Sequence, residues 1–320
     1  MVKTAPDSQA SSRNLYFDTA TLYYRAFFAV PESITAPDGT PSGAVRGFLD
    51  MVSAIAKQFP PIQVVFAWDD DWRPQWRVDL LPSYKLHRVD EESSDQSDAA
   101  FEVIPDALSP QINAISLILD AIGLPRIGQV GHEADDVLGA LVSKTNEPCD
   151  VVTGDRDLFQ LVDDQANVRV ISITKGVKNL EVVDDSYLRN RYGITGSQYA
   201  DFSMLRGDPS DGLPGVKGIG EKTAAKLITE FSDVQGLIAA ANDSTISLAP
   251  AVRRNLLDSQ TYMKAAGKVV RVKTSARLPK SLECPRQVKD SQSLSEMTDA
   301  WGIERQVKRF LKTLNIDWVA

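Results

Sequence analysis

Residues 150–157 read DVVTGDRD, a short apolar stretch that runs into two aspartates separated by one residue. Residues 150–153 have the length and composition of a buried β-strand. Two other apolar stretches, NLYFD at 14–18 and IQVVFAWD at 62–69, also end in an aspartate. We expect further strands at 125–130 and 168–173, and helical patterns lie between the strands. This alternation predicts an α/β fold on a mostly parallel sheet flanked by helices.

The expected helices fall into two groups along the chain. Apolar residues recur at helical spacing in the first part, as at Val45, Phe48 and Val52. The helices expected there cover 21–28, 43–59, 109–122 and 133–144, with a helical turn at 158–161. From residue 186 onward the pattern is chiefly helical, with helices at 187–192, 197–205, 222–230, 234–241 and 294–314. We therefore expect a disordered start at 1–12, an α/β domain at 13–195 and a helical region at 196–320.

Three groups of acidic residues stand beside the expected element boundaries, namely EADD at 133–136, DRD at 155–157 and DPSD at 208–211. In open α/β sheets, sites gather outside the carboxyl ends of the strands, so Asp18, Asp69 and Asp155 could converge there. Carboxylates without His or Cys partners suit hard cations such as Mg²⁺ or Mn²⁺. Acidic residues also favour helix N-termini. That alternative explains one acidic residue of 133–136 well and three poorly, so the groups together favour a metal site.

A glycine-rich segment, LPGVKGIG at 213–220, follows the third acidic group. Its glycines would let the backbone approach a phosphate closely, and nearby lysines add positive charge. A P-loop is excluded because Glu221 stands where that motif requires lysine. We interpret the segment as a helix–hairpin–helix that binds the phosphates of DNA, with a plain helical turn as the alternative. The residues assigned to this contact are Gly215, Lys217, Gly218, Gly220, Lys222 and Lys226.

Aromatic and basic residues are interleaved as WRPQWR at 72–77 and YKLHR at 84–88. Such interleaving suits the phosphates and unstacked bases of a single strand, and we assign Arg77, Tyr84 and Arg88 to DNA binding. An amphipathic surface helix is the alternative. Helical spacing would put Tyr84 and Arg88 on one face, with Lys85 beside them. Residues 89–100 are acidic and rich in serine, which predicts a mobile surface segment.

Bulk composition limits the class of protein only in part. The chain has 320 residues, of which 24% are charged, and a formal net charge of −8. This charge does not exclude nucleic-acid binding if the carboxylates gather on metal ions and the basic residues cluster elsewhere. Cys149 and Cys284 are too few for a disulfide framework or a zinc site. Since no apolar run approaches the roughly 18 residues of a membrane span, we expect a soluble cytoplasmic protein.

In their order along the chain, these segments resemble the bacterial and phage 5′→3′ exonucleases, or 5′-flap endonucleases. That family includes the N-terminal nuclease domain of bacterial DNA polymerase I. The resemblance spans residues 14–231 and rests on FD at 17–18 with YRAFF at 24–28, WR at 76–77 with YK at 84–85, and the segments 133–137, 153–161 and 207–226. It implies a PIN-like fold with a helical arch at about 74–108 and a C-terminal helix–hairpin–helix region. The chain ends where a polymerase module would begin, so we expect a stand-alone homologue.

The resemblance also implies roles for single residues. Arg25 and Lys85 would act at the scissile phosphate, Tyr84 would lie near the entering strand, and the hairpin could hold K⁺. Two or more Mg²⁺ or Mn²⁺ ions would be bound by Asp18, Asp69, Glu133, Asp135, Asp136, Asp155, Asp157, Asp208 and Asp211. The chain departs from the family pattern at Thr19, where glycine is usual, and at Gly212, where asparagine is usual. Asp70 is an alternative to Asp69, but strand continuity favours Asp69.

The implied function is metal-dependent hydrolysis of DNA at 5′ flaps and 5′ ends during replication and repair. Its partners would be DNA with a flap, nick or 5′ overhang, including RNA primers, and not a membrane. We expect a monomer in the bacterial cytoplasm, associated with the nucleoid. Two alternatives stay open: a PIN-like ribonuclease that acts on RNA, and a non-catalytic protein that binds DNA structures. A hairpin that tracks duplex DNA argues against the first, and the intact set of carboxylates argues against the second.

Overall fold

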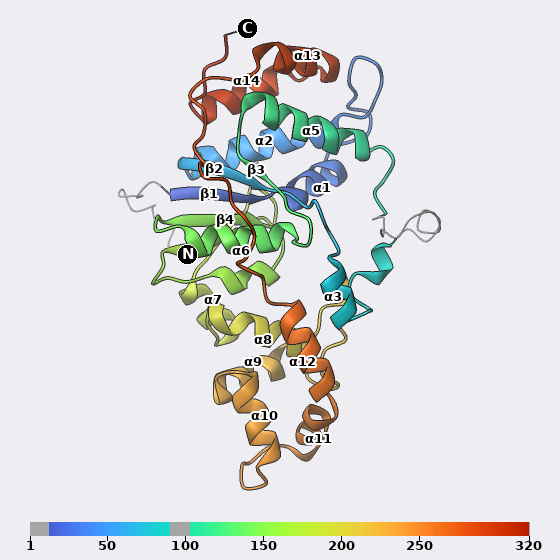
Figure 1. The fold of residues 1–320 in the computed structure, drawn as a ribbon, viewed down its shortest axis with the longest axis vertical. Coiled ribbons are helices and arrows are strands. Elements are labelled where there is room, and N and C mark those ends of the chain that lie inside the picture. The colour runs from blue at the N-terminus through green and yellow to red at the C-terminus, as the bar shows by residue number, and fades with distance from the viewer. Residues whose placement is uncertain (1–12, 90–102, 320) are drawn as a thin grey trace.

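The computed structural model of the chain describes residues 13–89 and 103–319. One six-stranded sheet has the strand order β3-β2-β1-β4-β5-β6 (Figure 1). Strands β1 to β5 are parallel, and only β6 pairs antiparallel with its neighbour. The strands are β1 (Arg13–Asp18), β2 (Pro61–Ala67), β3 (Arg126–Ile127), β4 (Cys149–Thr153), β5 (Val168–Ser172) and β6 (Glu181–Val183). The expected mostly parallel sheet is confirmed, and β1, β2 and β4, which lead into the strand-end aspartates, are neighbours.

The sheet is covered by helices on both faces because successive side chains of a strand point in opposite directions. Leu15 and Phe17 of β1 face one apolar cluster, and Tyr16 faces the other. Phe17 stacks on Phe66 of β2 with ring centroids 5.1 Å apart. The first face is covered by α1 (Thr19–Ala29), α2 (Gly43–Gln58) and α5 (Ser109–Ile122). The opposite face is covered mainly by α6 (Ala134–Lys144), the 3-10 helix Asp157–Leu161, α7 (Asp185–Tyr192) and α8 (Gly196–Arg206).

A helical region extends away from the sheet beyond α8 (Figure 1). It consists of α9 (Glu221–Phe231), α10 (Val234–Asn242), α11 (Pro250–Asp258) and α12 (Gln260–Val269). The last two helices, α13 (Ser291–Trp301) and α14 (Glu304–Thr313), instead return to pack on α5 and α2. The expectation of one helical region over 196–320 is therefore wrong for the final segment, because Val307, Phe310 and Leu311 bury their side chains against the sheet domain.

Most expected helices form where the apolar spacing placed them, but three details differ. The helix expected over 294–314 is divided into α13 and α14, since Gly302 adopts a left-handed φ of 60° and ends the first helix. Strand β6 and helices α11 and α12 were not predicted.

In the described ranges, no helix is long and apolar enough to cross a membrane. The expected disordered start lies outside the described residues.

The segment expected to form an arch is only partly helical in the described residues. Helix α3 (Gln75–Leu80) is followed by a turn and by a 3-10 helix at Leu86–Arg88. Lys85 stands between them with a left-handed φ of 47°. The expectation that Tyr84 and Arg88 share one helical face is therefore wrong, because the backbone leaves the helical conformation between them. Residues 90–102, which hold most of the expected acidic mobile segment, lie outside the described residues.

Replacing Phe310 with alanine should destabilise the sheet domain although the residue lies near the C-terminus. Phe310 is fully buried in the cluster that contains β1 and α2, and loss of a buried phenylalanine side chain typically costs about 3–5 kcal/mol. The measurement is urea denaturation followed by circular dichroism. Lys308→Ala on the same helix is the control, because Lys308 is exposed and, among the described residues, pairs only with Glu304 of its own helix. Equal unfolding midpoints for both variants would contradict the packing described here.

Candidate active site

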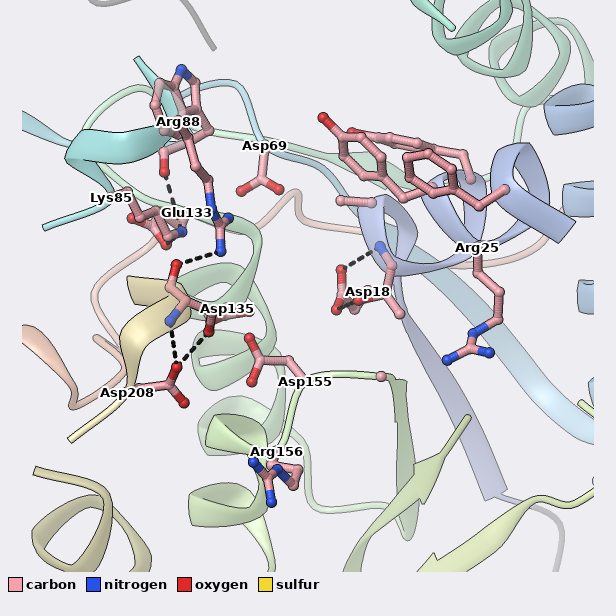
Figure 2. A pocket seen from close by; sticks show the side chains of 18 of the residues that line it. Asp18, Arg25, Asp69, Lys85, Arg88, Glu133, Asp135, Asp155, Arg156 and Asp208 are labelled. Atoms are coloured by element: carbon pink, nitrogen blue, oxygen red, sulfur yellow. Dashed lines mark hydrogen bonds and ion pairs between the residues drawn. The ribbon is translucent and has the colours of Figure 1, made fainter. Parts of the chain in front are cut away.

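A cleft of about 910 Å³ opens where β1, β2 and β4 end (Figure 2). Its acidic lining consists of Asp18, Asp69, Glu133, Asp135, Asp155 and Asp208. The first strand ends at Asp18, while Asp69 and Asp155 follow β2 and β4. Glu133 and Asp135 stand at the N-terminus of α6, and Asp208 comes from the loop after α8. The structure thus brings the strand-end aspartates together with members of the other two acidic groups.

Asp18 and Asp155 are linked through the hydroxyl of Thr153, the last residue of β4. This hydroxyl donates to Asp18 Oδ2 at 2.7 Å and accepts from the backbone N–H of Asp155 at 2.8 Å. Asp18 also caps α1 by accepting from the backbone N–H of Thr21 at 3.3 Å. These hydrogen bonds fix the carboxylate of Asp18 and the backbone of Asp155 at the edge of the sheet.

The side chains that follow β2 point in different directions. Asp69 lines the cleft, and its Oδ1 accepts from the backbone N–H of Ala134 at 2.8 Å. The Asp70 carboxylate instead packs against Gly128, where an added Cβ would lie only 2.4 Å from it. Asp71 accepts from the backbone N–H of Gly131 at 2.8 Å. The geometry therefore favours Asp69 over Asp70 as the residue that could hold an ion.

Glu133 lies at the back of the cleft and is surrounded by donors. Its carboxylate accepts from the Tyr84 hydroxyl at 2.9 Å and from Lys85 Nζ at 2.7 Å, and Arg77 lies 3.3 Å away. With its oxygens engaged in this way, Glu133 is better placed to bind the water of a metal ion than the ion itself. Tyr84 is only 3% exposed, so the expectation that its ring meets an entering strand is wrong in this structure.

Asp136 and Arg77 form a buried ion pair beneath the cleft. The two guanidinium nitrogens of Arg77 donate to the two oxygens of Asp136 at 2.8 and 3.0 Å. The same carboxylate accepts from the backbone N–H groups of Glu133 and Lys273, and Arg77 Nε donates to the carbonyl of Val269. The expected roles of Asp136 as a metal ligand and Arg77 as a DNA contact are both corrected, because these partners occupy their polar atoms and neither side chain reaches the surface.

Asp157, Asp208 and Asp211 form a second acidic group beside the first, which consists of Asp18, Asp69, Asp135 and Asp155. The Asp157 carboxylate accepts from the Ser203 hydroxyl at 2.8 Å, and Asp208 caps its own turn through the backbone N–H of Ser210. Arg206 approaches both carboxylates, at 3.8 Å from Asp157 and 3.2 Å from Asp208. Asp211 pairs with Arg88 at 3.4 Å. This group therefore already contains two arginines.

Basic residues flank the carboxylates on two sides (Figure 2). Lys85 lies beside Glu133, and its ammonium also donates to the carbonyl of Trp72. Arg25 extends from α1, where it donates to the carbonyl of Thr174 at 3.2 Å, and its buried Nε has no partner among the described residues. Arg88 donates to the carbonyl of Ser210 at 2.8 Å. These cations can meet an anionic substrate that lies across the acidic centre.

The loop at 208–212 is in close backbone contact with the segment before Lys85. The Lys85 backbone N–H donates to the carbonyl of Asp211 at 3.1 Å, and the Ser83 hydroxyl donates to the carbonyl of Gly212 at 2.8 Å. Gly212 has a φ of 69°, and an added Cβ would lie 2.0 Å from the carbonyl oxygen of Ser83. Only glycine fits there, which explains its presence where the family pattern has asparagine.

The cleft holds more acidic than basic groups, and burial together with this excess shifts the pKa values of its carboxyl groups. Desolvation, reinforced by the negative charges of Glu133 and Asp18, raises the pKa of Asp69 to about 7 although Lys85 opposes the rise. Desolvation and the charge of Asp155 raise the pKa of Asp135 well above its ordinary value. In the described part of the chain, no three acidic, His or Cys side chains yet converge at coordination distance. The donors are nevertheless all oxygen atoms, which suits a hard divalent cation. Such a cation would also offset the repulsion between the carboxylates.

The hairpin between α8 and α9 presents most of its assigned residues to solvent. Lys217, Gly218, Gly220, Lys222 and Lys226 are all exposed. Gly215 differs, because its backbone N–H donates to the hydroxyl of Tyr262 at 3.1 Å and an added Cβ would lie 2.6 Å from the carbonyl of Arg206. The expected phosphate contact of Gly215 is therefore corrected to a packing role.

Three residues of the site were missed from the sequence. Thr153 and Ser203 position carboxylates through their hydroxyls, and Arg206 stands between two of them. Thr153 could have been found as the last residue of a strand that leads into Asp155. Ser203 and Arg206 carry no such local signal, because only the packing of α8 against the turn at 157–161 brings them to the site.

Comparisons with known proteins agree with this fold. The model of the 5′-3′ exonuclease N-terminal resolvase-like domain matches residues 13–193, and that of the 5′-3′ exonuclease C-terminal SAM fold matches residues 194–293. A 5′-3′ exonuclease of Streptomyces coelicolor is 50% identical over 301 residues, which cover 94% of this chain and 99% of that protein. DNA polymerase I of Mycobacterium tuberculosis is 35% identical over 263 residues, or 80% of this chain and 27% of the polymerase.

Solved structures show the same architecture at low sequence identity. The T5 5′-exonuclease with bound zinc ions has a TM-score of 0.61 at 18% identity, covering 94% of this chain and 98% of that one. The T5 D15 flap endonuclease in a complex with DNA and metal ions has a TM-score of 0.60. A PIN-like sheet domain with an acidic cleft at its strand ends, joined to a SAM-like helical region, defines a class of metal-dependent nucleases. Within that class, the chain belongs to the 5′-3′ exonuclease family.

Replacing Arg77 with methionine should destabilise the protein by about 3–5 kcal/mol, because it leaves the charge of Asp136 buried without its partner. Urea denaturation measures this loss. The double variant Arg77→Met, Asp136→Leu removes both charges and should recover much of the stability. A single variant as stable as the parent would contradict the structural role assigned to the pair.

Proposed function

We propose that this protein is a metal-dependent DNA nuclease that hydrolyses phosphodiesters at 5′ flaps and 5′ ends. The observation that carries the proposal is the cleft in which Asp18, Asp69, Asp135 and Asp155 face one another beside Lys85. The family relationship supports the same activity, since the 50% identical relative is named a 5′-3′ exonuclease. The fold relative from phage T5 is described as a flap endonuclease in complex with DNA and metal ions.

Asp18, Asp69, Asp135 and Asp155 would hold the first divalent ion, and Asp157, Asp208 and Asp211 would complete a second site with Asp155. We propose Mg²⁺ or Mn²⁺ because the donors are all hard oxygens. Bound ions would supply an activated water and positive charge for the phosphate oxygens. Glu133 accepts hydrogen bonds at the back of the cleft and would orient a water molecule there.

Lys85 and Arg25 would bind the scissile phosphate from opposite sides of the carboxylates (Figure 2). Lys85 is fixed for this role, because its backbone N–H is bound to Asp211 and its ammonium rests on Glu133. Its charge would stabilise the negative charge that develops on the phosphate. Arg88 lies beside the same wall and would bind the strand that leads into the cleft.

The hairpin would hold the duplex on the far side of the cut. Lys217, Lys222 and Lys226 are exposed around the N-terminus of α9, where free backbone N–H groups favour phosphate. A K⁺ ion held by hairpin carbonyls would strengthen this contact. We further propose that RNA primers and DNA flaps are both accepted, that the protein acts as a monomer near the nucleoid of a bacterial cell, and that it serves replication and repair.

Removal of divalent metal should abolish cleavage of a labelled 5′-flap DNA, and Mg²⁺ or Mn²⁺ should restore it. Asp69→Ala should lower the single-turnover rate by at least about 10³-fold, because it removes charge that holds the metal. The matched control is Asp70→Ala, whose carboxylate points toward Gly128 and away from the cleft. Loss of activity in Asp70→Ala with retention in Asp69→Ala would overturn the assignment. An RNA flap of the same sequence, cleaved in preference, would identify a ribonuclease instead.

Lys217→Ala should weaken binding of duplex-containing DNA about equally across sequences. It should also reduce the slope of log affinity against log salt concentration by about one unit, as expected for the loss of one phosphate contact. Fluorescence anisotropy at several salt concentrations measures both quantities. Lys308→Ala on α14, far from the hairpin, should leave the slope unchanged. A change in base preference without a change in slope would contradict the proposed phosphate contact.

A further inference from the structure

Arg206 occupies an unexpected position for a basic residue. It is the last residue of α8, and its guanidinium lies beside two carboxylates that would bind metal. One guanidinium nitrogen lies 3.2 Å from Asp208 Oδ2 and 3.8 Å from Asp157 Oδ1. A fixed positive charge therefore already stands within the second acidic group.

Several contacts hold the Arg206 guanidinium in this place. Its Nε donates to the carbonyl of Gly207 at 3.0 Å, and one terminal nitrogen donates to the hydroxyl of Ser203 at 3.3 Å. The guanidinium also lies 5.4 Å from the ring centre of Phe202. The side chain is only 10% exposed, and its other terminal nitrogen is buried without a hydrogen-bond partner in the described structure. Arg206 is thus held much more firmly than Arg88, whose side chain is 35% exposed.

The first acidic group has no equivalent cation between its carboxylates. Lys85 and Arg77 contact Glu133 from behind, and no described ion pair involves Asp18, Asp69 or Asp135. A divalent ion in the first group therefore meets carboxylates that form no described ion pair and are opposed only by the charge of the nearby Lys85. In the second group an ion would meet carboxylates whose charge Arg206 has partly neutralised, and it would itself be repelled by the guanidinium.

We infer that Arg206 serves as a built-in cation of the second metal site. Because of its charge, the second site binds a divalent ion with lower affinity than the first. In the protein without DNA, the first group would fill at low metal concentration and the second only at high concentration. The same terminal nitrogen of Arg206 lies near both Asp157 and Asp208, so its charge would act on both carboxylates of that site. The inference rests on the proposed metal-dependent function, but it concerns the unequal affinity of the two sites and not the cleavage itself.

The test measures the binding of Mn²⁺ to the full chain without DNA. Isothermal titration calorimetry and electron paramagnetic resonance of free Mn²⁺ are the two methods. The parent protein should bind one ion tightly and a second weakly. Arg206→Met replaces the side chain with a long uncharged one, and it should tighten the second ion by at least about tenfold, or about 1.4 kcal/mol. Arg206→Lys retains the charge, so its two sites should bind Mn²⁺ with unequal affinities, as in the parent protein. Arg206→Gln serves the same purpose as the methionine variant if that variant does not fold.

Arg156→Met is the matched control for net charge. Arg156 also lines the cleft, but it makes no ion pair with the carboxylates of the described residues. Its removal should tighten the second ion much less than removal of Arg206. Equal tightening by both variants, or an unchanged second affinity in Arg206→Met and Arg206→Gln, would overturn the inference while leaving the metal sites in place. Failure of every protein, the parent included, to bind Mn²⁺ would overturn the inference together with the proposed metal-dependent function.

Discussion

The buried ion pair of Arg77 and Asp136 is the interaction on which the arrangement of the cleft depends. Asp136 binds Arg77 of α3, caps its own helix at Glu133, and accepts from the backbone N–H of Lys273 beyond α12. Arg77 in turn binds the carbonyl of Val269 at the end of α12. Three segments distant in sequence therefore meet at one carboxylate. Since a buried charge is tolerated only when all its partners are present, this pair fixes the helical region relative to the sheet domain.

The acidic cleft works against folding, and the surrounding secondary structure compensates for it. Burial first, and then the neighbouring carboxylates, raise the pKa values of Asp69 and Asp135, so keeping these groups charged in the cleft costs free energy. The carboxylates of Asp18 and Asp69 accept hydrogen bonds from neighbouring elements, namely from Thr153 of β4 and from the backbone N–H of Ala134. The scaffold thus holds in place groups that would otherwise move apart. A rigid sheet edge suits such a site better than a mobile loop does.

How far the sequence could predict this structure depends on whether the signal was local. Asp18, Asp69 and Asp155 stand at the carboxyl ends of predicted parallel strands, so their common position at one sheet edge could be foreseen. The burial of Arg77 and Tyr84 could not, because charged and aromatic residues near a helix look the same whether they face DNA or a protein interior. No local sequence pattern predicts that α14 packs against the sheet domain. Such pairings depend on tertiary packing, which no spacing along the chain encodes.

The glycine at position 212 joins the two parts of the molecule to which DNA binding is assigned in the proposed function. Its missing side chain allows the backbone before Lys85 to lie directly on the loop that leads into the hairpin, with Ser83 and Asp211 completing the contact. Lys85 and the hairpin are therefore joined by a few covalent bonds and short hydrogen bonds, without an intervening hinge. In the proposed function, a tilt of the duplex on the hairpin would be passed on to the ammonium group at the cleft. The angle between the duplex and its single-stranded end would then affect the position of Lys85.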